Sequence, residues 1–211
     1  NVELVGAGPA TLFQLGADAN IDVVAANGLT NLRMRNLRID GNRANNTSGT
    51  RQGLWLYNVV DGWIENVEVV GGRSDGFRLD VCERVELMGC RAFDNGRHGF
   101  SLSFSMYCQL VSPRSYDNCQ VVSVGTGDGI NLELLSAYNT IIAPACYERS
   151  LTGDRQGWGV REAAGEGCHH NLVIGGALPG NRSGWVSLDS GDSVAITPDL
   201  IQLTSRVTVT A

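Results

Sequence analysis

The chain has little of what marks several common classes of protein. Only 5 of its 211 residues are proline and 18% are charged. No apolar run approaches the roughly 20 residues that a membrane helix needs. The formal net charge of −6 disfavours nucleic acid as a partner. We therefore expect neither membrane insertion nor nucleic-acid binding.

Metal-binding motifs are missing as well. The six cysteines include no C-x-x-C pair, which argues against a zinc ribbon or a thioredoxin-like site. The sequence contains no EF-hand pattern, and His169–His170 has no carboxylate at the spacing of zinc proteases. We expect no metal site and no cofactor, with calcium alone left open. The cysteines, Cys90, Cys108 and Cys146 among them, are expected to be small buried residues.

Glycine is plentiful, and six of the 27 glycines fall in a regular series at positions 53, 76, 99, 129, 159 and 184. The first four begin the similar strands GLWLY, GFRLD, GFSLS and GINLE. A polar break, a second short strand and a turn follow each of them. A repeat of about 23–30 residues with short strands and no helical pattern predicts a parallel β-solenoid, here of about seven or eight coils.

Alternation along these strands assigns each residue to one of two faces. Leu54 and Leu56 point inward, as do their counterparts in later coils. The intervening residues point outward and form columns whose members lie about 4.8 Å apart. The first column is Trp55, Arg78, Ser101, Asn131 and Arg161; the second is Tyr57, Asp80, Ser103, Glu133 and Ala163; the third, before the glycines, is Asp75, His98 and Asp128.

These columns place acid–base groups on one surface. Asp75 and Asp128 flank His98, and two such carboxylates are predicted to raise the pKa of its ring and to fix one tautomer. Asp80 and Glu133 are two coils apart, about 9.5 Å, at the upper limit of the roughly 6.5–9.5 Å that inverting glycosidases use. All five residues are therefore candidate catalytic groups.

The same surface offers groups that bind sugars. Arginine binds the carboxylate of an acidic sugar in a bidentate manner, and aromatic rings with one wet edge stack on sugar rings. The candidate substrate-binding residues are Arg78, Arg97, Arg161, Trp55, Tyr57, Asn131 and Trp158. Two insertions, at 119–128 and 149–158, are expected to build a wall beside this surface.

Structural roles are the alternative for several of these residues. Asp75 and Asp128 precede glycines in turns, where aspartate caps backbone amides. Asp80 is otherwise an ordinary solvated residue. Arg78 and Arg97 would then only form ion pairs with neighbouring carboxylates. Such pairs contribute little to the stability of the fold when they are exposed.

The repeat resembles that of the right-handed parallel β-helix, or pectin-lyase-like, superfamily. Residues 74–103, SDGFRLDVCERVELMGCRAFDNGRHGFSLS, are similar to the catalytic module of alginate C5-epimerases, in which a DGF-x-x-D turn precedes an N-x-RHGF turn. That resemblance implies a catalytic aspartate at Asp80 and active-site roles for Arg97 and His98. The Tyr-Gly-Phe-Asp-Pro-His segment of that family is replaced by QGLWLY at 52–57. Coils such as GDGINLE at 127–133 also resemble those of phage tailspike depolymerases.

We therefore predict a single all-β domain over 1–211, a right-handed parallel β-helix. It has an opening coil at 1–20, regular coils at 21–190 and a C-terminal β segment at 191–211. Because the first residues, NVELVGAG, already have a strand pattern, we expect a piece of a longer chain.

The functional hypothesis is a polysaccharide-binding β-helix that degrades or modifies its polymer as a lyase or glycoside hydrolase of the tailspike kind. One alternative is a non-catalytic adhesin or spike shaft, and another is an enzyme similar to mannuronan C5-epimerases. The resemblance implies a location outside the cell or on a virion surface, and it leaves a homotrimer open.

Overall fold

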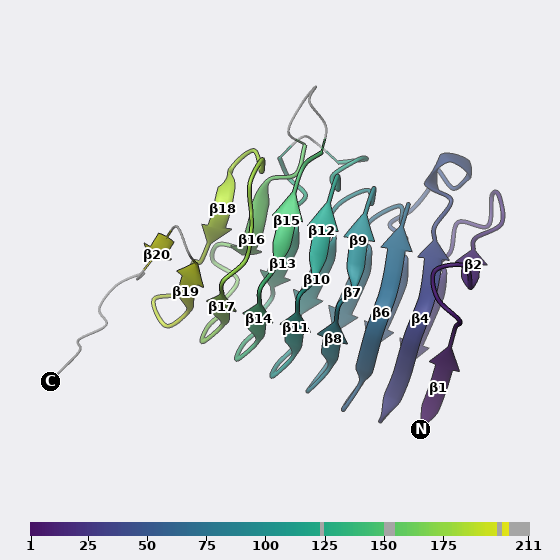
Figure 1. The fold of residues 1–211 in the computed structure, drawn as a ribbon, viewed down its shortest axis with the longest axis horizontal. Coiled ribbons are helices and arrows are strands. Elements are labelled where there is room, and N and C mark those ends of the chain that lie inside the picture. Colours follow the sequence, from purple (N-terminus) through teal and green to yellow (C-terminus); the bar gives the residue numbers. More distant parts are fainter. Residues whose placement is uncertain (123–124, 150–154, 198–199, 203–211) are drawn as a thin grey trace, which may run out of the picture.

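The computed structural model describes residues 1–122, 125–149, 155–197 and 200–202. They form a rod in which short strands lie side by side along the long axis (Figure 1). A seven-stranded sheet contains β3 (Val24–Asn27), β5 (Leu54–Tyr57), β7 (Phe77–Asp80), β10 (Phe100–Ser103), β13 (Ile130–Glu133), β16 (Trp158–Glu162) and β18 (Gly184–Ser187). No helix among the described residues is long and apolar enough to cross a membrane.

A thirteen-stranded sheet forms the remaining walls of the rod. It contains β1 (Val2–Val5), β2 (Leu12–Gln14), β4 (Leu32–Asp40), β6 (Trp63–Val70), β8 (Glu86–Met88), β9 (Arg91–Phe93), β11 (Gln109–Val111), β12 (Arg114–Tyr116), β14 (Thr140–Ile142), β15 (Ala145–Tyr147), β17 (Leu172–Ile174), β19 (Val194–Thr197) and β20 (Leu200–Gln202). The long strand β6 pairs with both β8 and β9, so one wall becomes two in the following coils. A short 3-10 turn, Arg43–Asn45, follows β4.

Parallel pairing joins successive coils in the predicted register. Phe77 pairs with Phe100 and Phe100 with Ile130, and the pairing continues to β16. All strand pairs described between coils are parallel, while β20 turns back antiparallel on β19. The fold is therefore the predicted parallel β-helix. Of the predicted C-terminal β segment, 198–199 and 203–211 lie outside the described residues.

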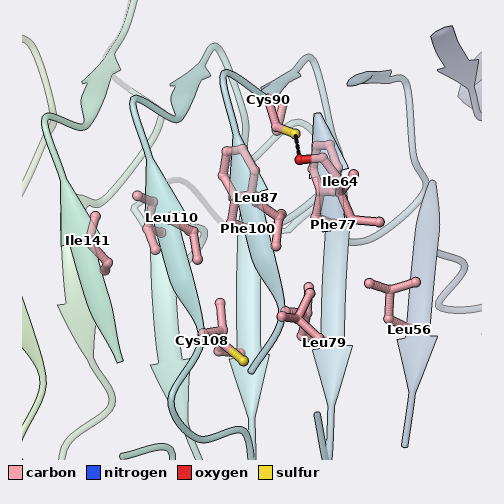
Figure 2. Packing of buried hydrophobic residues seen from close by; sticks show 14 of the residues in the cluster. Leu56, Ile64, Phe77, Leu79, Leu87, Cys90, Phe100, Cys108, Leu110 and Ile141 are labelled. Carbon is pink, nitrogen blue, oxygen red and sulfur yellow. Dashed lines mark hydrogen bonds between the residues drawn. The ribbon is translucent and has the colours of Figure 1, made fainter. Parts of the chain in front are cut away.

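The core lies between the walls and consists of inward residues stacked coil upon coil. Leu54, Leu56, Phe77, Leu79, Phe100, Leu102, Ile130 and Leu132 are all fully buried, as the alternation predicts. The Phe77 and Phe100 rings stack with centroids 4.7 Å apart (Figure 2). Each such side chain contributes about 1.5–3 kcal/mol when it leaves water, so this ribbon of apolar contacts is the main source of stability.

All six cysteines are buried, which confirms the prediction for Cys90, Cys108 and Cys146. The Sγ of Cys90 donates to the carbonyl oxygen of Ile64 at 3.5 Å (Figure 2). Burial raises the pKa of the Cys90 and Cys108 thiols to about 12. These thiols therefore fill space in the core and are unsuited to act as nucleophiles.

The recurrent glycine is required by the distance between coils. A Cβ on Gly99 would lie 2.0 Å from the Oγ of Ser115 and 2.8 Å from the carbonyl oxygen of Gly129 in the next coil. Gly76 and Gly129 are equally crowded by their neighbouring coils. The series of glycines thus marks the start of each strand because no larger residue fits there.

Candidate functional site

The outward face of β7, β10, β13 and β16 carries the candidate site. Arg78 pairs with Ser101 and Ser101 with Asn131, while Asp80, Ser103 and Glu133 follow one another in the same way. Tyr57 pairs with Asp80. The structure therefore brings together the first two columns that the sequence predicts.

A hydrogen-bonded ladder runs beneath this face along the rod. In each coil, the residue before the recurrent glycine accepts a backbone N–H from the next coil. Asp75 Oδ1 accepts from His98 N at 3.1 Å, His98 Nδ1 from Asp128 N at 2.8 Å, and Asp128 Oδ1 from Trp158 N at 2.8 Å. The members of the third predicted column therefore align coil upon coil, but the prediction that they point outward is wrong, because Asp75, His98 and Asp128 are at most 1% exposed. Their side chains instead satisfy backbone groups that would otherwise be buried without partners.

The ladder extends further than the sequence analysis proposed. Gln52 Oε1 accepts from Asp75 N at 2.8 Å, and Asp22 Oδ1 accepts from Gln52 N at 2.6 Å. The signal was present in the sequence, because Gln52 precedes Gly53 as Asp75 precedes Gly76. An uncharged amide gives no electrostatic signal in the sequence, so Gln52 is not distinguished there from an ordinary polar residue.

His98 is neutral in this arrangement. Its Nδ1 accepts a hydrogen bond, so the proton of the neutral ring is on Nε2. The side chain is 1% exposed, and its buried Nε2 has no hydrogen-bond partner among the described residues. Burial lowers the pKa of His98 well below its ordinary value, and Arg97, Arg161 and Arg78 lower it further. The predicted increase in the pKa of His98 is therefore wrong, because removal from water and three nearby arginines outweigh the two carboxylates.

The two ladder aspartates show the opposite effect. Burial raises the pKa of Asp75, and burial raises that of Asp128 to about 6, although nearby arginines oppose the shift at both sites. Both carboxyl groups have no exposed side-chain surface. Each has one oxygen on the ladder and turns the other to an arginine, Arg78 at 3.2 Å and Arg161 at 3.5 Å, respectively.

Arg78 joins the two outward carboxylates. Its Nε lies 2.9 Å from Asp80 Oδ1, and its Nη1 lies 2.9 Å from Glu133 Oε1. Burial alone would lower the pKa of Arg78, but Asp80, Asp75 and Glu133 raise it above its ordinary value. One guanidinium therefore holds Asp80 and Glu133 on the same patch, as the column spacing predicts, and compensates their charge.

Arg97 and Arg161 are bound more loosely. Arg97 Nη2 lies 3.5 Å from Glu133 Oε2, and Arg161 Nη1 lies 3.5 Å from Asp128 Oδ2. Their side chains are 37% and 33% exposed, against 17% for Arg78. These two guanidinium groups can accept an added anion with little rearrangement.

The other predicted binding residues divide into accessible and enclosed ones. Tyr57 is 39% exposed, and the half-buried Trp55 donates from Nε1 to Asp80 Oδ2 at 2.6 Å. Trp158 is also half-buried. Asn131, predicted to point outward to substrate, is 1% exposed and donates to Glu133 Oε2 at 3.0 Å. The prediction that Asn131 meets substrate is therefore wrong, and its hydrogen bond positions the Glu133 carboxylate instead.

The described residues contain no group of three or more His, Cys, Asp or Glu side chains that could hold a metal ion. His169 and His170 approach each other with their Nδ1 atoms 2.9 Å apart on another part of the surface. Of the two insertions expected to form a wall, residues 123–124 and 150–154 lie outside the described part of the chain.

Comparisons with known proteins add little to this geometry. No family model matches the chain, and no curated protein does. Among solved structures it is similar to the A-module of mannuronan C-5 epimerase AlgE4 of Azotobacter vinelandii, with 16% identity over 92% of this chain and 83% of that one and a TM-score of 0.39. The AlgE6 A-module of the same organism gives 14% identity, coverage of 94% and 84%, and a TM-score of 0.35. At these values the likeness does not decide an activity.

Proposed function

We propose that the protein binds an acidic polysaccharide along the outward face of the seven-stranded sheet and cleaves or modifies it there. The observation that carries this proposal is a set of donors without strong partners. Among the described residues, the guanidinium groups of Arg97 and Arg161 make ion pairs only at 3.5 Å, and both are about one third exposed, at 37% and 33%. Such a cluster is suited to a sugar carboxylate, which accepts several charge-assisted hydrogen bonds.

Asp80 and Glu133 are the acid–base candidates on this face. Donors around the carboxylate of a uronic acid stabilise the negative charge that develops when the neighbouring C5 proton leaves. For that reason we place a lyase-type reaction before hydrolysis, and an epimerase-like reaction after both. His98 is neutral, buried and bonded through Nδ1, so it is not the general base and serves to hold the backbone beneath the site.

A rod-shaped polysaccharide depolymerase of this kind would work outside the cell or on a virion surface. We extend the proposal to such a location and to a tailspike-like role, with a homotrimer as one form of assembly. A calcium ion stays a separate proposal, to be tested by adding a chelator to the binding assay.

A glycan-binding protein without catalysis is the second candidate, and a specific observation favours it. Asp80 and Glu133 are both paired with Arg78, and this ion pairing occupies oxygens that would otherwise accept a proton from substrate. If these ion pairs persist in the complex, the face recognises the polymer but leaves it intact.

Turnover assays distinguish these candidates. The protein is incubated with a panel of acidic and neutral bacterial polysaccharides while absorbance near 235 nm, reducing ends and bound polymer are followed. Rising absorbance indicates a lyase, reducing ends alone a hydrolase, and binding alone an adhesin. We expect Asp80→Asn and Glu133→Gln to reduce turnover at least about a hundredfold, as loss of a general acid or base does.

The matched control is Asp61→Asn, because Asp61 is an exposed carboxylate paired with Arg84 away from this face. It should leave turnover unchanged. Neutral polymers bound as tightly as acidic ones would contradict the proposal. Full turnover by Asp80→Asn would remove Asp80 from the mechanism.

A further inference from the structure

The turns that follow the seven-stranded sheet expose a strip of large apolar side chains in three successive coils. We call it the turn strip. Its members are between 39% and 55% exposed: Val81, Phe104, Met106, Tyr107, Leu134, Leu135 and Tyr138. Isolated exposed hydrophobic residues are ordinary on a protein surface, but a continuous patch of this kind usually marks an interaction site.

Register makes the strip continuous. The last residues of β7, β10 and β13 pair in register across the three coils. The residue directly after each of them belongs to the strip: Val81, Phe104 and Leu134. Tyr107 and Tyr138 each follow one partner of the bridge between Met106 and Ala137. Their rings stack 5.1 Å apart with planes 14° from parallel. The strip therefore runs straight along the rod axis.

Backbone conformation shows that these residues are unfavourable for the turn itself. Val81, Phe104 and Leu134 have φ of 55°, 49° and 49°, a left-handed region in which bulky residues are rare and strained. One coil earlier, the same position holds Asn58, with φ of 52°, a residue type that tolerates this conformation.

The tyrosines of the turn strip show the same feature. Tyr107 and Tyr138 have φ of 57° and 58°, whereas Asp61 holds the equivalent place two coils before Tyr107, with φ of 56°. Two unfavourable features, an apolar surface in water and a strained backbone, thus coincide at the same positions. Neither helps a single chain to fold, since the earlier coil makes the same turns with Asn58 and Asp61.

We propose that the turn strip is the surface through which two copies of this chain pack side by side. The exposed parts of seven such side chains amount to several hundred Å², like the largest patches of monomeric proteins at about 300–600 Å². That is a large part of the about 800 Å² that each partner buries in a standard interface, in which a polar rim surrounds an apolar centre. The seven side chains of the strip carry no charge, so they do not repel those of a second copy, whereas an acidic polymer finds no donors along its aliphatic part.

The strip also borders the candidate site. Asp80 and Glu133 are the residues directly before Val81 and Leu134, so a second rod would lie beside the outward face. Self-association does not depend on the proposed function, and the two are tested separately.

Sedimentation velocity over a hundredfold range of protein concentration measures the association. We expect the wild-type chain to form a dimer or a larger assembly as concentration rises. Phe104→Asn combined with Leu134→Asn copies the residue type of Asn58 and should weaken association at least tenfold. Because asparagine suits the left-handed turn, this double variant should unfold at no lower temperature than the wild type when both are monomeric.

The matched control is Phe13→Asn, which removes an exposed phenylalanine of β2 outside the strip and should leave association unchanged. Tyr107→Asp, which copies Asp61, provides a second disruption if the double variant does not fold. A wild-type chain that is monomeric at every concentration would overturn the proposal. So would an assembly that persists with the strip variants, or one that Phe13→Asn disrupts equally.

Discussion

His98 uses its two ring nitrogens for different purposes. Nδ1 accepts the backbone N–H of Asp128 at 2.8 Å, which ties one coil to the next. Nε2 is buried and has no hydrogen-bond partner in the part of the chain that the structure describes. Asp75 and Asp128 divide their two oxygens in the same way, between a backbone amide and a guanidinium. Each of these residues therefore supports the fold and positions charge for the site at once.

The contribution of the His98 hydrogen bond to the free energy of unfolding can be measured separately from any effect on binding. His98→Ala leaves the buried N–H of Asp128 without an acceptor, which costs about 1–3 kcal/mol, in addition to the cavity it creates. His98→Asn retains an oxygen in the place of Nδ1, so its loss of unfolding free energy in urea should be clearly smaller. Equal losses for the two variants would show that this hydrogen bond does not stabilise the coil contact.

At the scale of the strand, the crowding of coils decides which residue can begin each turn of the rod. Gly99→Ala forces a Cβ against Ser115 and the backbone of Gly129, and overpacking of this kind costs about 1–3 kcal/mol. Gly16→Ala is the control, because nothing lies within 4 Å of its added Cβ. Its unfolding free energy should change by less than about 0.5 kcal/mol. If the thermal unfolding of both variants matched the wild type, the coils would be less tightly spaced than described.

The strands could be predicted from the sequence, because alternating inward and outward side chains and a recurrent glycine at each strand start follow directly from the geometry of stacked coils. Alternation identified Phe77, Phe100 and Ile130 as core residues, and the repeat set their register. The electrostatics of the site were not predictable in the same way. The pKa of His98 depends on how completely the ring is removed from water and on Arg97, a near neighbour in sequence that was assigned to substrate instead of to the histidine. Burial of Asn131 likewise depends on the conformations of longer side chains around it.

At the scale of the whole molecule, three arginines gather on one face of the rod, Arg78, Arg97 and Arg161, although the chain carries a net charge of −6. The same face holds their carboxylate partners, so it is not positively charged as a whole. Because exposed charges act over only about 8–10 Å at moderate salt, an anionic polymer would be attracted by close contact with the more exposed Arg97 and Arg161 and not by a long-range field. The stacked coils then offer the polymer a surface that continues along the axis.

A crystal structure of the protein with a bound uronic acid tetrasaccharide tests this account most directly. We predict that the sugar lies along the outward face of the seven-stranded sheet, with one carboxylate within hydrogen-bonding distance of Arg97 and Arg161. A tetrasaccharide bound on the thirteen-stranded sheet, or one whose carboxylates avoid both arginines, would contradict it.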